Sequence, residues 1–189
     1  MKIILASKSK SRKQLLTDLK IPFDVVVSNA DETPNSSLPF GEQLKEIALR
    51  KALNVLKKTK DDGKRIILAA DQNIVFNNKM FGKPKSIEEA KTLIKSMEGH
   101  TVYAYTGNAF LLASGETIIK CINNYDIANI FVKEVTDIVL DDYLKNYNPL
   151  SMCGGISTLD TPFVELTDGL LSTAYGITIE YLAQLNNAF

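Results

Sequence analysis

One aspartate interrupts an otherwise apolar strand pattern near the middle of this chain. Residues 66–75 read IILAADQNIV, and Asp71 stands among side chains that are mostly apolar. A carboxylate at such a position raises the free energy of the fold unless it is paired or bound to a cation. Two interpretations follow. Asp71 is either a structural acid that hydrogen-bonds a loop, or a metal ligand and general base in a cleft.

Several cations stand at the ends of the expected elements. Lys83 lies in a Gly-Lys-Pro turn that can aim its side chain, and Lys51 lies near the edge of an apolar helix stripe. Arg12 and Lys13 open the first expected helix, where cations oppose the helix dipole and so hint at a bound anion. Taken singly, each is also explained as a solvated surface residue.

A second acid, Glu32, lies in the turn-rich segment 29–39. Four cations and two acids at loop or element ends suit a phosphorylated ligand with a hard divalent metal. The chain contains neither G-x-x-x-x-G-K-[ST] nor G-x-G-x-x-G. Because His100 is the single histidine and the two cysteines are far apart, any metal must be held by carboxylates and by the substrate.

Composition excludes several other classes of protein. The 189 residues suit one domain, or one domain with two lobes, and 22 basic residues balance 22 acidic ones. A broad nucleic-acid surface is therefore not expected. The first apolar run stops at Ala6, too short for a signal peptide, and no apolar stretch has the ~20 residues of a membrane span. We expect a soluble, cytoplasmic protein with no membrane or nucleic-acid partner, and a homodimer by default.

The elements that must position these residues alternate between strand and helix. Apolar patterns predict strands over residues 2–6, 23–28, 66–75, 101–113 and 116–128. Helical spacing predicts helices after the polar turn 7–12, across 44–56, from a capping box at 86–89 to about 97, from a cap at Asp137, and over 177–185. Residues 77–78 predict a hairpin turn, and 146–161 an irregular segment. The class is therefore α/β with a mixed sheet. The first helix start follows a strand directly, which makes it a natural anion site.

Six groups of residues, in order, resemble the Maf-like nucleotide pyrophosphatase family, also known as septum formation proteins. They are the LAS opening with its later Arg and Leu-Leu (5–16), the DETP turn (31–34), ALRKA (48–52), ADQ with FGKP (70–72 and 81–84), the glycines and TG of the hairpin (99 and 105–107), and FVE with two later glycines (163–165, 169 and 176). Each motif is weak alone, but six in the family's order are specific.

The resemblance implies a fold and a reaction. The fold is a mixed twisted sheet flanked by helices, with two lobes around a central cleft, similar to inosine-triphosphate pyrophosphatases, in one domain over residues 1–189. The reaction is metal-dependent hydrolysis of a nucleoside triphosphate to the monophosphate and pyrophosphate. The implied catalytic residues are Asp71, Lys83 and Glu32. The implied phosphate and substrate contacts are Ser7, Arg12, Lys13, Lys51 and Gln72, and the implied ligands of Mg²⁺ or Mn²⁺ are Asp71 and Glu32.

The resemblance also bears on the substrate. Gln72 after Asp71 is similar to the 7-methyl-GTP subgroup, whereas the dTTP/UTP subgroup usually has threonine there. We therefore expect 7-methyl-GTP, with dTTP or UTP as the alternative. Gln72 reads the ligand or fixes Asp71, or else it is a simple structural amide.

Three departures from the family pattern keep a different class open. Lys10 replaces the family's proline, its arginine pair reads Arg12-Lys13, and the segment 154–160 is a few residues shorter. A lysine keeps the charge but loses the bidentate geometry of arginine. These departures permit a nucleotide-binding regulator of cell division with weak or no turnover. Another pyrophosphatase of the inosine-triphosphate type is the third alternative, and only the resemblance of the LAS opening speaks against it.

Overall fold

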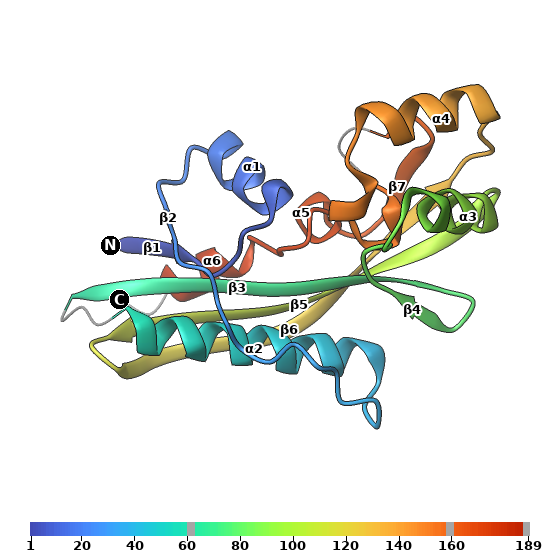
Figure 1. Ribbon diagram of the computed structural model, residues 1–189. Helices are drawn as coiled ribbons and strands as arrows, with labels where there is room; N and C mark the ends of the chain where they lie inside the picture. The colour runs from blue at the N-terminus through green and yellow to red at the C-terminus, as the bar shows by residue number, and fades with distance from the viewer. Residues whose placement is uncertain (60–62, 158–160, 187–189) are drawn as a thin grey trace. The chain divides into compact units, whose positions relative to one another are not determined.

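The computed structural model describes residues 1–59, 63–157 and 161–186, in which strands and helices alternate along the chain (Figure 1). The strands are β1 (Lys2–Leu5), β2 (Asp24–Val25), β3 (Lys64–Phe76), β4 (Lys79–Phe81), β5 (His100–Ser114), β6 (Thr117–Val132) and β7 (Val164–Asp168). The helices are α1 (Lys10–Asp18), α2 (Phe40–Lys58), α3 (Ile87–Met97), α4 (Asp137–Asn146), α5 (Leu171–Ala174) and α6 (Tyr181–Asn186), with short 3-10 turns at Pro149–Ser151 and Cys153–Gly155. The α/β class is confirmed.

The strands form one mixed sheet, as predicted. Its order is β2-β1-β3-β5-β6-β7, and β4 pairs with β3 off this path. β1 runs parallel to β2 and β3, whereas β4 is antiparallel to β3 and β7 is antiparallel to β6. The two long strands β5 and β6 are sheet neighbours on either side of the predicted turn.

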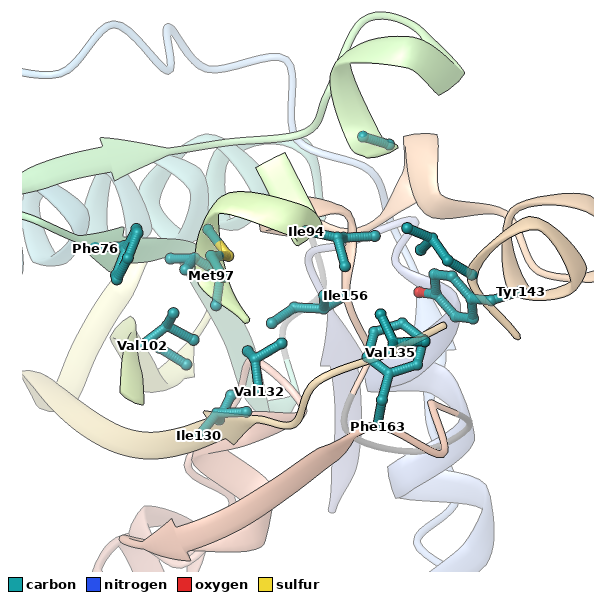
Figure 2. Close-up of a cluster of buried hydrophobic side chains, with 14 of the residues drawn as sticks. Phe76, Ile94, Met97, Val102, Ile130, Val132, Val135, Tyr143, Ile156 and Phe163 are labelled. Atoms are coloured by element: carbon teal, nitrogen blue, oxygen red, sulfur yellow. The ribbon is translucent and has the colours of Figure 1, made fainter. Parts of the chain in front are cut away.

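The chain divides into two compact units, each with its own hydrophobic core. The first unit comprises Met1–Asp71, Thr106–Asp126 and Gly176–Phe189, and the second comprises Gln72–Tyr105 and Ile127–Tyr175. The first core lies between α2 and the strands β1, β3 and β5, with Ile4, Ala48, Val55, Ile67 and Leu111 among its members. Figure 2 shows the second core, which includes Phe76, Ile94, Met97, Val102, Ile130, Val132, Val135, Tyr143, Ile156 and Phe163. The two lobes that the resemblance implies correspond to these units.

Two glycines let α2 lie close to the strands beneath it. A Cβ atom at Gly107 on β5 would lie 2.2 Å from the carbonyl carbon of Leu44, and one at Gly41 would lie 2.4 Å from the ring of Tyr125. Real Cβ atoms do not approach other heavy atoms so closely, so larger side chains would push the helix away. The glycine of the TG motif thus sets the position of the helix that carries Lys51.

The structure differs from the sequence-based expectation in β3. The polar residues 71–73 were expected to interrupt this strand, yet β3 continues to Phe76 with these three residues half-buried. The strand then reverses at Asn77 and Asn78, whose φ angles of 47° and 55° suit a tight hairpin turn, and pairs with β4. Asp71 is therefore held by a rigid strand rather than by a loop.

Three element ends also differ. The strand expected over 23–28 shrinks to two residues, because the backbone that follows it bonds to side chains of α2. The last helix begins at Tyr181 instead of 177, because the N–H of Thr178 donates to Asn108 Oδ1 at 2.9 Å. Thr136, not Asp137, caps α4. Of the irregular segment predicted over 146–161, residues 158–160 lie outside the described residues.

In the part of the chain that the structure describes, no helix has both the length and the apolar character that a membrane crossing requires.

Candidate active site

Two of the predicted acids converge on one buried lysine within the first unit. Lys51 Nζ lies 3.0 Å from Asp71 Oδ1 and 3.3 Å from Glu32 Oε2. The exposed fraction is 9% for the Lys51 side chain, 17% for Asp71 and 53% for Glu32. A half-buried carboxylate beside a buried ammonium interacts more strongly than a surface pair does, because water screens it less. This triad brings together a strand, a helix and a loop that are remote in the sequence.

The local sequence explains why Lys51 is buried. Its neighbours Ala48 and Ala52 are fully buried against the sheet and leave room for a long side chain beside them. The aliphatic stem of a lysine covers apolar surface while its ammonium reaches a polar partner. Here that partner is Asp71, at the point where β3 changes from fully buried to half-buried residues.

Arg12 is buried and directed at protein acceptors. Its Nε donates to Gly176 O at 2.6 Å, and its Nη1 donates to Ser7 Oγ at 3.1 Å and to Ala70 O at 2.8 Å. Ser7 Oγ also accepts a hydrogen bond from Ser9 N at 3.1 Å. Arg12 therefore ties the end of β1, the residue before Asp71 and the segment that precedes α6 to the start of α1. Lys13, its neighbour, is half-buried.

Replacing Arg12 by lysine is expected to lower the free energy of unfolding by about 1–3 kcal/mol, because an ammonium cannot reach three acceptors in the planar pattern of a guanidinium. Urea unfolding of Arg12→Lys and wild type measures this. Lys13→Ala, a change of the neighbouring cation, is expected to stay within about 0.5 kcal/mol of wild type. Equal stability of Arg12→Lys and wild type would show that these three contacts do not hold the site together.

The loop that carries Glu32 has internal order. Asp31 Oδ1 accepts hydrogen bonds from Thr33 Oγ1 at 2.7 Å and from Thr33 N at 2.9 Å, which form an Asx turn. These bonds, and then the nearby Arg50 guanidinium, hold the pKa of Asp31 below its ordinary value. Asp31 therefore stays ionised to lower pH than a free aspartate, and the turn that it forms presents the adjacent Glu32 to Lys51.

Gln72 and Lys83 lie in the second unit. Gln72 Nε2 donates to Thr173 O at 2.9 Å and to Ala174 O at 3.2 Å, and Gln72 O accepts from Cys153 Sγ at 2.9 Å. These contacts favour the structural-amide interpretation of Gln72. Lys83 is exposed at the predicted turn, which is fastened by a bond from Gly154 N to Gly82 O at 2.8 Å.

The donors available to a metal are hard oxygens. Asp71 and Glu32 already share one cation, the Lys51 ammonium, so their oxygens face a common point. Within residues 1–59, 63–157 and 161–186, no group of three or more His, Cys, Asp or Glu side chains is arranged to hold a metal ion. The acid pair fits a divalent cation of the Mg²⁺ class if water oxygens, or water together with substrate oxygens, complete its coordination.

Sequence reasoning missed Arg50. Its Nη2 donates to Thr33 O at 2.7 Å, and its Nη1 lies 3.6 Å from Asp31 Oδ2. The one available signal was a basic pair, Arg50-Lys51, in a helix that follows an acidic pair, Asp31-Glu32. The structure pairs these two dipeptides residue by residue.

Comparison with known proteins gives consistent findings. The model of the Maf-like protein family matches residues 2–189. A dTTP/UTP pyrophosphatase of Clostridium beijerinckii is 34% identical over 189 residues, covering 96% of each chain. One of Thermotoga petrophila is 33% identical over 181 residues, covering 95% of this chain and 85% of that protein. A solved nucleoside-triphosphatase / dITP/XTP pyrophosphatase of Mycobacterium abscessus is a loose structural likeness, with a TM-score of 0.42, 13% identity, and coverage of 99% of this chain and 94% of that one.

Proposed function

Since this chain belongs to the Maf-like protein family, we propose that it hydrolyses a nucleoside triphosphate to the monophosphate and pyrophosphate. The observation that carries the proposal is the convergence of Asp71 and Glu32 on Lys51. An acid pair beside a buried cation supplies both a proton acceptor and a positive charge. Hydrolysis of a phosphoric anhydride requires both.

In the proposed reaction, water is the nucleophile and Asp71 is the proton acceptor. The oxygen of a water molecule forms a bond to the α-phosphorus, and the bond from that phosphorus to the bridging oxygen breaks. Pyrophosphate leaves with the electron pair, and Asp71 accepts a proton from the attacking water. Glu32 assists Asp71, and Lys51 attracts the phosphate oxygens, whereas the catalytic role of Lys83 stays a prediction from the resemblance.

The start of α1 supplies the remaining contacts. We propose that phosphate oxygens are bound by Ser7, by Lys13 and by N–H groups at the start of this nine-residue helix, because N–H groups at a helix start favour anions. Arg12 was expected to clamp phosphate directly. Its bonds to Gly176 O, Ala70 O and Ser7 Oγ support a different role, in which it anchors this wall of the site.

Asp71 and Glu32 are proposed to hold Mg²⁺ or Mn²⁺, an ion that would offset the negative charge of the phosphate oxygens. We expect excess EDTA to abolish turnover and added Mg²⁺ or Mn²⁺ to restore it. The measurement is pyrophosphate release before and after chelation. Full activity in excess EDTA would show that hydrolysis does not require a metal ion.

For the substrate we propose a pyrimidine nucleoside triphosphate. The relatives compared above bear the name dTTP/UTP pyrophosphatase, and the Gln72 amide is engaged by main-chain carbonyls. The competing substrate is 7-methyl-GTP, which the Asp71-Gln72 pair led us to expect. A panel of nucleotides is expected to give the highest kcat/KM for dTTP or UTP. Preference for 7-methyl-GTP would restore the expectation drawn from Gln72.

The same panel tests the rival function. A regulator of cell division would bind nucleotides without releasing pyrophosphate, so binding without turnover across the panel would favour it. The assignment of residues 1–189 to one Maf-like domain, the homodimer and the cytoplasmic location stay predictions.

A further inference from the structure

Three polar side chains form a stripe along one side of α2. Arg50, Asn54 and Lys58 follow one another at intervals of four residues, so they lie on the same face of the helix. We call these three residues the docking stripe. The segment 27–33, which we call the acidic loop, is hydrogen-bonded to these three residues. In Figure 1 the chain between β2 and α2 passes in front of this helix.

Each member of the docking stripe binds one main-chain group of the acidic loop. The contacts are Lys58 Nζ donating to Val27 O at 3.0 Å, Asn29 N donating to Asn54 Oδ1 at 3.0 Å, and Arg50 Nη2 donating to Thr33 O at 2.7 Å. The loop and the helix run antiparallel here, because loop residues of increasing number bind helix residues of decreasing number. Asn54 Oδ1 also accepts from Ser28 Oγ at 3.4 Å.

The loop depends on these contacts for its path. Residues 27–33 belong to no strand or helix, so their backbone groups need partners from elsewhere or from water. A long connection without secondary structure of its own is often functional. This one is fastened at both ends, at Val27 by Lys58 and at Thr33 by Arg50, and near its middle by Asn54.

The fastened loop carries Glu32 to the triad. Glu32 Oε2 reaches Lys51 Nζ at 3.3 Å although its side chain is 53% exposed. Water screens the half-exposed carboxylate of this ion pair, so the pair alone holds Glu32 weakly, and its position depends on the backbone that bears it. We propose that the docking stripe, and Asn54 above all, is a positioning device that holds Glu32 beside Asp71 and Lys51. This inference rests on the proposed function only in taking Glu32 as part of the metal and substrate site.

Asn54 offers the cleanest test, because its replacement by leucine does not alter the charge of the site. Asn54→Leu keeps a similar shape and removes the acceptor, whereas Asn54→Asp keeps an oxygen that can accept from Asn29 N. Lys57→Leu changes an exposed residue of the same helix outside the stripe and serves as the control. Each variant is examined by Mn²⁺ titration without nucleotide, by steady-state kinetics and by urea unfolding.

We expect Asn54→Leu to weaken Mn²⁺ binding by about tenfold, in the range known for groups that orient a metal ligand, and to lower kcat/KM to a similar degree. Its unfolding midpoint is expected to change little, and Asn54→Asp and Lys57→Leu to behave like wild type. In a Glu32→Gln background, Asn54→Leu is expected to cause no further loss of Mn²⁺ binding or of kcat/KM, because Asn54 acts only by positioning the Glu32 carboxylate.

Two results would overturn the proposal. One is wild-type Mn²⁺ binding and kcat/KM in Asn54→Leu. The other is an equal loss with and without Glu32, which would show that Asn54 acts only on stability or on another part of the site. Failure of the proposed function is a separate result: a wild-type protein that releases no pyrophosphate refutes the activity, whereas the Glu32-dependent change in Mn²⁺ binding still tests the docking stripe.

Discussion

Asp71→Asn is expected to lower kcat by about 100-fold or more while the protein stays folded. The amide has nearly the same shape as the carboxylate, but it neither accepts a proton from water nor carries the charge that faces Lys51 Nζ at 3.0 Å. Because Asp71 is held by β3, which runs unbroken from Lys64 to Phe76, the substitution should not move the strand.

The matched control is Asp24→Asn on β2, which makes the same chemical change at an acid paired with Lys2 on the surface. Its kcat is expected to equal that of wild type. Steady-state kinetics give the rates, and thermal melts check folding. A folded Asp71→Asn protein with wild-type kcat/KM would return Asp71 to the structural interpretation and favour a binding protein.

Lys51→Met is expected to lower kcat/KM by about 100-fold, since it removes a buried positive charge that would otherwise attract the phosphate oxygens. The same substitution should strengthen the binding of a divalent metal ion. Asp71 and Glu32 share the ammonium, so without it their negative charges face each other, and a divalent cation relieves that repulsion more effectively than in wild type.

Mn²⁺ titration without nucleotide is therefore expected to give tighter binding for Lys51→Met than for wild type. Lys57→Met removes the same charge from an exposed position of α2 and should leave both quantities unchanged. If Lys51→Met keeps wild-type kcat/KM, the lysine only neutralises the acid pair and does not serve the substrate.

Local patterns predicted much of the fold. The polar turn before α1, the apolar stripe of α2 and the Asn77-Asn78 hairpin each depend on residues close in sequence, so propensity and spacing were sufficient. The boundaries that failed depend on distant partners. The strand expected over 23–28 is shorter, because side chains of α2 form hydrogen bonds with the backbone after it. The last helix begins later than expected, because the N–H of Thr178 donates to Asn108.

The candidate site was predictable in its residue types but not in its geometry. Asp71 was visible as an anomaly in its strand, Lys51 at the edge of its helix stripe and Glu32 in its turn-rich segment. The resemblance then assigned roles to these three residues, which the structure brings to one point. The direction of Arg12 was not visible, because its acceptor Gly176 O lies 164 positions away along the chain. A sequence shows that an arginine is charged, but it does not show which carbonyl oxygens accept its hydrogen bonds.

If water attacks the α-phosphorus at the site around Asp71, the oxygen of that water ends in the nucleoside monophosphate, so an isotope label reveals which bond is cleaved. The wild-type protein is supplied with dTTP or UTP and Mg²⁺ in water labelled with heavy oxygen, and the products are separated and weighed by mass spectrometry. We expect one labelled oxygen in each nucleoside monophosphate and none in pyrophosphate. Label in pyrophosphate, or release of labelled orthophosphate with a nucleoside diphosphate, would contradict it.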